Sequence, residues 1–111
     1  MHNLREWVQL IDLIADPRRH VGKTISVAGV FGVYGETWPA LYLDGSAAAA
    51  GVDTSAVTVA CGKSKRFKAV CVSPQARSGK YAIVVATVGL GKVRGSTSVM
   101  LEDVQSLELI D

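Results

Sequence analysis

Residues 22–44 read Gly22-Lys-Thr-Ile-Ser-Val-Ala-Gly-Val-Phe-Gly-Val-Tyr-Gly-Glu-Thr-Trp-Pro-Ala-Leu-Tyr-Leu-Asp44, and they predict a long bent strand, a turn and a second strand. In the first strand, apolar side chains alternate with smaller or more polar ones, as is typical of a half-buried strand. The inward set is Ile25, Val27, Phe31 and Val33, and the outward set is Thr24, Ser26, Ala28 and Tyr34. Gly29 interrupts the inward set, which marks a bulge, a bend or a close backbone approach. A first strand bent there can serve both sheets of a small barrel.

Four further segments have strand patterns, with β-branched or alternating apolar residues. They are Ala40–Asp44, Val57–Cys61, Tyr81–Val88 and Ser98–Ile110. In the first of them, Leu41 and Leu43 are expected to point inward and Tyr42 outward. The continuous apolar run from Tyr81 predicts a strand covered on both sides. The last segment has an interruption in its pattern at residues 102–103.

The N-terminal segment has a helical pattern that Pro17 must end near Ala15. Its apolar residues at helical spacing are Leu4, Trp7, Val8, Ile11 and Ile14. The pattern equally allows an extended stretch from Trp7 to Leu10, followed by a helix from Ile11 to Ala15. Either arrangement predicts a segment that covers apolar surface.

The connections are less regular. Alanines 47–50 predict a single helical turn, with Ser46 suited to the N-cap and Gly51 to the C′ position. Residues 62–80 are interpreted as a connection, since Phe67, Val70 and Cys71 fit a short helix while residues 69–72 fit an extended stretch equally well. Residues 89–95 contain three glycines and predict a turn.

Five short antiparallel strands with a bent first strand predict an all-β fold, the five-stranded Greek-key barrel of the oligonucleotide/oligosaccharide-binding (OB) type, with a short N-terminal helix. At 111 residues, the chain is expected to form one domain, residues 1–111. Within it, residues 1–16 form the N-terminal helical segment and residues 22–110 form the barrel.

Three segments also carry a resemblance to known proteins: Asp12-Leu-Ile-Ala-Asp-Pro-Arg-Arg-His-Val-Gly-Lys-Thr-Ile-Ser-Val-Ala-Gly29, Ala40-Leu-Tyr-Leu43 and Gly79-Lys-Tyr-Ala-Ile-Val-Val-Ala86. Together they cover about half the chain, and they resemble a group of small, largely uncharacterised bacterial OB-fold-like proteins. Those proteins typically read Leu-Ile-x-x-Pro, Gly-Lys-x-Val-x-Val-x-Gly, Leu-Tyr-Leu and Gly-Lys-Tyr-Val. Ala86 departs from the pattern, because such proteins tend to have glycine there, and this puts the bend of the fourth strand in question. The resemblance implies a fold and no particular activity.

The composition argues against a disordered protein and against a membrane-spanning one. Hydrophobic residues make up 49% of the chain, which excludes a disordered protein, yet no apolar run approaches the roughly 18 residues of a membrane span. Acids at Glu6, Asp12 and Asp16 do not fit a secretory signal. We therefore expect a soluble cytoplasmic protein with no membrane partner.

The sequence signals for a catalytic site or a metal site are weak. Cys61 and Cys71 lie ten positions apart with no metal-ligand spacing, so we interpret them as structural thiols. The tripeptides beginning at Gly22 and Gly62 lack the upstream glycine of a phosphate-binding loop, and His20 is expected to be a solvated loop histidine. The sequence therefore predicts no catalytic residue, no metal site, no cofactor and no enzymatic activity.

Charge is distributed unevenly along the chain. Residues 54–101 carry eight Lys or Arg and no acid, whereas residues 102–111 carry four acids and no Lys or Arg, within a net charge of +2. Such a basic block attracts anionic partners. The alternative is that the acidic last strand lies beside it and neutralises much of its field.

OB folds bind ligands on strands two and three and the flanking loops, where aromatic side chains stack on bases and cations meet phosphates. The predicted stacking residues are Tyr34, Trp38 and Tyr42, and the predicted basic groove is Lys63, Lys65, Arg66, Lys92 and Arg94. These residues predict a binding module for single-stranded nucleic acid or another anionic polymer, unless the aromatics only cap the barrel. The alternative function is a protein-interaction or assembly module that uses strand edges and the same aromatics.

Overall fold

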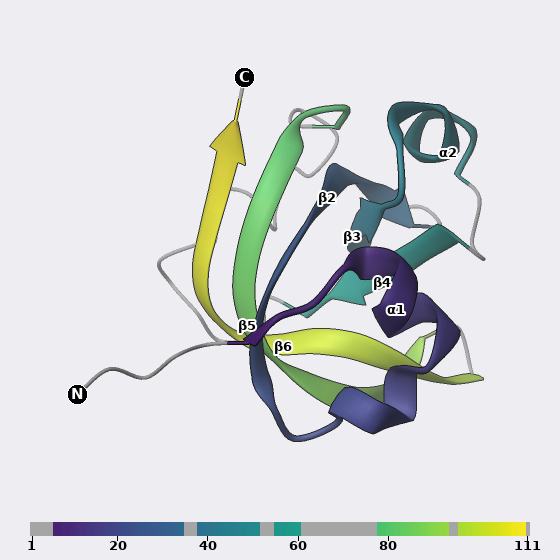
Figure 1. Cartoon of the computed structure of the whole chain (residues 1–111). Coiled ribbons are helices and arrows are strands. Elements are labelled where there is room, and N and C mark those ends of the chain that lie inside the picture. The colour runs from purple at the N-terminus through teal and green to yellow at the C-terminus, as the bar shows by residue number, and fades with distance from the viewer. Residues whose placement is uncertain (1–5, 35–37, 52–54, 61–77, 94–95, 111) are drawn as a thin grey trace.

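The computed structural model describes residues 6–34, 38–51, 55–60, 78–93 and 96–110 (Figure 1). The described part is mostly strand, with short helices before the barrel and after its second strand. In chain order the elements are β1 (Glu6–Trp7), α1 (Leu10–Ala15), the 3-10 helix η1 (Pro17–His20), β2 (Thr24–Tyr34), β3 (Trp38–Tyr42), α2 (Gly45–Ala50), β4 (Ala56–Val59), β5 (Tyr81–Val93) and β6 (Ser96–Ile110).

Hydrogen bonds between strands close the sheet into a barrel. The order is β1-β2-β3-β4-β6-β5, and a further pairing between β2 and β5 joins the two sides of the ring. Strand β6 lies between β4 and β5 in this order, although it follows β5 in the chain. Strand β4 is parallel to β6, whereas the pairs β2–β3, β3–β4 and β5–β6 are antiparallel. This is a five-stranded Greek-key barrel with minor helix, and the predicted fold class is confirmed.

The long strand β2 holds the barrel together because it has two different neighbours. Residues 24–30 pair with β5 and residues 30–34 pair with β3. Gly29 lies at the change of neighbour and is buried. A β-carbon there would lie 3.0 Å from the carbonyl oxygen of Tyr42 and 3.0 Å from Cδ2 of Leu10. Pairing continues through Gly29 without a shift in register, so the glycine marks a close approach rather than a bulge.

The interior of the barrel contains three of the four predicted inward side chains of β2, while Val33 is only partly buried and lies outside the core cluster. Ile25, Val27 and Phe31 are fully buried, and inward residues of the other strands and of the N-terminal segment complete the core. That core includes Val8, Leu10, Leu13, Leu41, Val57, Val59, Ala82, Val84, Ala86, Val88, Leu101 and Val104. Val99, Leu107 and Leu109 of β6 are partly buried and pack against it.

The N-terminal segment follows the second of the two predicted arrangements. Trp7 belongs to the short strand β1, which pairs in parallel with β2 at Ile25 and Ser26, and helix α1 begins at Leu10. A continuous helix from Leu4 was therefore the wrong alternative. Leu10 and Leu13 are the buried residues of α1 and belong to the barrel core, so the segment covers apolar surface as expected.

Strands β5 and β6 are longer than predicted. Residues 89–93, predicted as part of a turn, continue β5 and pair with residues 96–100 of β6. Both strands bend sharply, with one arm crossing the bottom of the barrel and the other rising toward the C-terminus (Figure 1). The register shifts between Val85 and Thr87, and Asp103 has a φ of 50°. The predicted interruption at residues 102–103 is thus confirmed, and the bend at Ala86 forms without glycine.

Helix α2 forms where the alanines predicted a helical turn. Gly51 follows it in the left-handed conformation, as expected of the C′ position. The predicted N-cap was wrong by two residues: Asp44, not Ser46, accepts a hydrogen bond of 2.8 Å from the backbone N–H of Ala47.

Candidate binding surface

Tyr42 cannot act as the predicted stacking platform. Its side chain is fully buried, and its hydroxyl donates a hydrogen bond of 2.7 Å to the carbonyl oxygen of Val33. The alternation of β3 does place it outside the barrel, where it packs with Ala40 and with Ala47 and Ala48 of α2. Helix α2 therefore covers the ring. The alanines predicted this helix, but the sequence did not show that it packs on this face of β3. Leu43, expected to point inward, is 39% exposed instead.

A small second core thus occupies the outer face of β3. A β-carbon at Gly32 would lie 3.0 Å from two ring carbons of Tyr42, so only glycine leaves room for the aromatic ring there. Thr58, which pairs with Ala40 across β3 and β4, is also buried. The face on which OB folds commonly hold their ligands is covered at these positions.

The other predicted ligand residues are only partly placed. Trp38 is half-buried at the start of β3, and the register puts position 34 opposite it. Lys92 lies in β5 opposite Thr97. The remaining four predicted cations fall outside the described residues; they are Lys63, Lys65, Arg66 and Arg94. Whether the basic groove assembles therefore remains a prediction.

The most exposed apolar surface lies elsewhere, beside β1. Five of the seven large apolar side chains that are exposed in the described part gather on this side of the molecule: Trp7, Ile11, Leu43, Tyr81 and Ile110. The first four line a hollow of about 410 Å³ together with Val8, Gln9, Leu10 and Ala28. We call this hollow the Trp7 groove. Trp7 is 65% exposed and Tyr81 is 49% exposed, which is unusual for aromatic residues in a small barrel.

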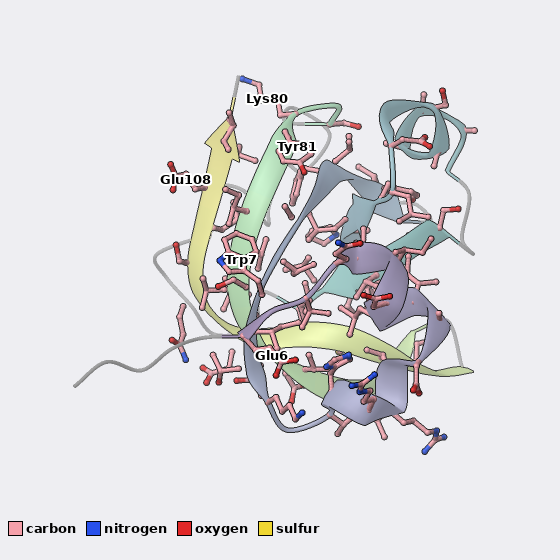
Figure 2. All side chains as sticks on the ribbon, viewed as in Figure 1. Glu6, Trp7, Lys80, Tyr81 and Glu108 are labelled. Atoms are coloured by element: carbon pink, nitrogen blue, oxygen red, sulfur yellow. The ribbon has the colours of Figure 1, made fainter. Side chains whose placement is uncertain are left out.

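Strand register explains how the Trp7 groove forms. Trp7 pairs with Ser26 on one edge of β2, while Val30 pairs with Tyr81 on the other edge. Ala28 lies between these positions, and its small side chain leaves a gap between the two aromatic residues. Figure 2 shows Trp7 in front of β5, with Tyr81 further along the same strand.

A smaller polar pocket adjoins the Trp7 groove, since Trp7 and Val8 line both. Its volume is about 250 Å³, and the remaining lining residues are Glu6, Asp12, Ala15, Asp16, Arg19 and His20. We call it the acidic pocket because three carboxylates line it against one guanidinium. At its edge, Lys23 Nζ lies 3.9 Å from Glu6 Oε1, in an ion pair with both side chains about half exposed.

His20 departs from the prediction. It is only 5% exposed, in η1 rather than in a solvated loop. Within the described part of the chain, its Nδ1 has no hydrogen-bond partner. A buried polar atom of this kind usually has a partner, so Nδ1 of this pocket-lining residue has unused hydrogen-bonding capacity.

Sequence reasoning missed the Trp7 groove because both arrangements predicted for the N-terminal segment have it cover apolar surface, and because Tyr81 is predicted in a strand covered on both sides. One signal was present: Ala28 is the small residue between larger outward neighbours in β2. The pairing of β2 with a dipeptide strand, which the sequence does not reveal, brings Trp7 to it.

Two features are absent from the described residues. None of their helices is long and apolar enough to cross a membrane. None of their His, Cys, Asp and Glu side chains form a group of three or more that could hold a metal ion.

Comparisons with known proteins give one structural relative to report. No protein-family model matches the chain, and no curated protein matches it. Among solved structures, it is similar to a putative aspartyl-tRNA synthetase from Leishmania major Friedlin, with a TM-score of 0.55 and 12% sequence identity. The match covers 98% of this chain and 21% of that chain, so this chain spans about one fifth of the length of its relative. At this identity the similarity shows the fold alone.

Proposed function

We propose that the chain is a non-enzymatic OB-fold binding module whose ligand is single-stranded nucleic acid or another anionic polymer. The observation that carries the proposal is the basic block: residues 54–101 contain eight Lys or Arg and no acid. Cations without interspersed carboxylates favour contact with phosphates. The structural similarity to part of a protein described as a tRNA synthetase adds support at the level of the fold.

The burial of Tyr42 moves the proposed contact away from the centre of β3. Helix α2 covers that centre, whereas Trp38 at the start of β3 is half-buried and keeps part of its ring at the surface. We place the stacking contact at Trp38 and the phosphate contacts on the basic block, including Lys92 and Arg94. Such an arrangement binds the backbone through charge and one base through stacking, with little sequence preference.

Fluorescence anisotropy with a labelled single-stranded oligonucleotide, repeated over a salt series, tests this function. Each phosphate neutralised on a single strand contributes about −0.7 to the slope of log affinity against log salt. The double variant Lys92→Ala/Arg94→Ala should flatten the slope. Trp38→Ala should lower affinity while leaving the slope nearly unchanged, because stacking releases few counterions.

The matched control is Arg18→Ala/Arg19→Ala, which removes the same charge from exposed positions outside the basic block. It should change the slope less than the double variant in the block. Absence of binding at low salt to both DNA and RNA would exclude the proposed function. An equal response to the two double variants would reduce it to nonspecific charge attraction.

A further inference from the structure

We propose that the Trp7 groove and the acidic pocket together form a docking site for an extended peptide segment of another protein, in which a Lys or Arg neighbours a large apolar residue. This site uses different residues from those proposed to contact nucleic acid. The apolar side chain would occupy the Trp7 groove over Ala28, and the cation would enter the acidic pocket beside it.

The apolar half of the site follows from exposure and shape. Trp7, Ile11 and Tyr81 are each about half exposed or more, although folding normally removes such side chains from water. A hollow of about 410 Å³ accommodates one or two side chains. A hollow of this kind admits side chains that project from a partner, whereas a stable protein dimer buries a broad surface of roughly 800 Å² on each partner. A short segment therefore fits the groove better than a second copy of this chain.

The charged half follows from complementarity. Glu6, Asp12 and Asp16 line the acidic pocket together with Arg19, and Lys23 pairs with Glu6 at its edge. The three carboxylates outnumber these two cations, so the pocket favours a cation over phosphate. His20 also lines the pocket, and its buried Nδ1 has no hydrogen-bond partner among the described residues.

A fourth acid extends the complementarity around the groove. The register places Ala28, Ile83 and Glu108 opposite one another on β2, β5 and β6, and Glu108 is exposed. Figure 2 shows Glu6 and Glu108 at different ends of the surface that carries Trp7 and Tyr81. Carboxylates therefore border the apolar surface on two sides, with Lys80 beside Tyr81 at its upper end. The two carboxylates favour a basic segment over an acidic one.

Trp7 connects the two halves, because it lines both the groove and the pocket. An exposed indole attracts a nearby ammonium or guanidinium group through its π-face. The same side chain can thus pack against the apolar residue of a peptide and against the stem of its neighbouring Lys or Arg. This shared wall is the reason that we assign both hollows to one ligand.

The test uses the whole chain as bait for a displayed library of random peptides, followed by fluorescence anisotropy with the selected peptides after synthesis and labelling. Selection should enrich sequences that contain a Lys or Arg next to Leu, Ile, Phe or Trp. Trp7→Ala should weaken binding about tenfold, as expected of a central aromatic contact. Ala28→Glu, which fills the groove and adds a charge at a half-buried strand position, should also abolish most of the binding.

Two matched controls separate the halves of the proposal. Leu90→Ala removes an apolar side chain that is 44% exposed outside the groove and should leave affinity unchanged. Asp12→Asn/Asp16→Asn should weaken binding of the cationic peptides about two- to fivefold, whereas Asp103→Asn, outside the acidic pocket, should not. Circular dichroism of each variant confirms that it is folded.

Three outcomes would overturn the inference. Selection without any enriched pattern, or enriched peptides whose affinity is insensitive to both Trp7→Ala and Ala28→Glu, would show that the groove is not a docking site. Equal binding by the wild type and Asp12→Asn/Asp16→Asn, with unchanged affinity when the peptide cation is replaced by Ala, would show that the pocket recognises no cation. The oligonucleotide experiment is independent of all three, so the proposed function and this inference can fail separately.

Discussion

The hydroxyl of Tyr42 donates a hydrogen bond of 2.7 Å to the carbonyl oxygen of Val33, linking β3 to β2 outside the barrel. The tyrosine ring lies between Gly32 and helix α2, so this bond fixes the small second core. An aromatic residue that looked like a ligand platform is instead part of what holds the helix to the sheet.

Tyr42→Phe should therefore destabilise the protein by about 0.5–1.5 kcal/mol, the net worth of a hydrogen bond between neutral groups. The ring and its packing remain, so the structure should be retained. Urea unfolding followed by circular dichroism measures the change. Tyr81→Phe, at a residue that is 49% exposed, is the control and should leave the midpoint unchanged. Equal midpoints for both variants would contradict the role assigned to Tyr42.

Helix α2 depends on Asp44 for its first turn. The carboxylate accepts the backbone N–H of Ala47, and loss of an N-cap side chain costs about 0.5–2 kcal/mol. Asp44→Ala should lower the thermal midpoint accordingly. Ser46→Ala is the control, because Ser46 is the N-cap that the sequence suggests but the structure does not use. A larger effect at Ser46 than at Asp44 would show that the helix begins later.

Gly29 should not tolerate a side chain. Its missing β-carbon faces the carbonyl oxygen of Tyr42, which the pairing of β2 with β3 holds in place. We expect Gly29→Val to destabilise the protein by about 1–3 kcal/mol through backbone strain and overpacking. Gly45→Val is the control, since a β-carbon there meets nothing within 4 Å. An unchanged melting temperature for Gly29→Val would mean that β2 is not held close to β3 at this point.

Asp103 has a φ of 50° at the register shift of β6. The left-handed region costs an ordinary residue about 1–2 kcal/mol, is hardest for β-branched side chains and costs glycine little. Asp103→Val should therefore destabilise the protein by about that amount, whereas Asp103→Gly should be neutral or stabilising. Thermal unfolding of the two variants beside the wild type gives the order. Equal stability of the Val and Gly variants would place residue 103 in an ordinary extended conformation.

Much of the fold was predictable from local pattern. The alternation around Gly29 identified the long strand and its buried side chains. Strand periodicity assigns Ile25, Val27 and Phe31 to one face of the strand, independently of what packs against that face. The interruption near Asp103 was visible as a break in the same kind of pattern. The C-terminal end of β5 was missed, since Gly89 and Gly91 resemble turn residues. In the structure they lie in the strand, where a β-carbon would collide with Glu102 and Met100, respectively.

The candidate site was less predictable than the fold. Periodicity says which face of β3 carries Tyr42, but it does not say whether another element covers that face. Helix α2 covers it, and the exposed aromatic surface arises instead at Trp7 and Tyr81, 74 positions apart in the sequence.

The sequence by itself determined the barrel, the bend of its first strand and the separation of basic and acidic segments. Only the tertiary structure decided which aromatic side chains are exposed to solvent and which acidic side chains lie beside Trp7. The physical reason is that the two properties depend on different parts of the chain. Strand alternation is set by adjacent residues, whereas the exposure of a side chain depends on which distant segments pack against its face of the sheet. The dipeptide strand at Trp7 is too short to have a period, so its position on β2 follows from pairing with that strand and from the burial of Val8 and Leu10 in the barrel.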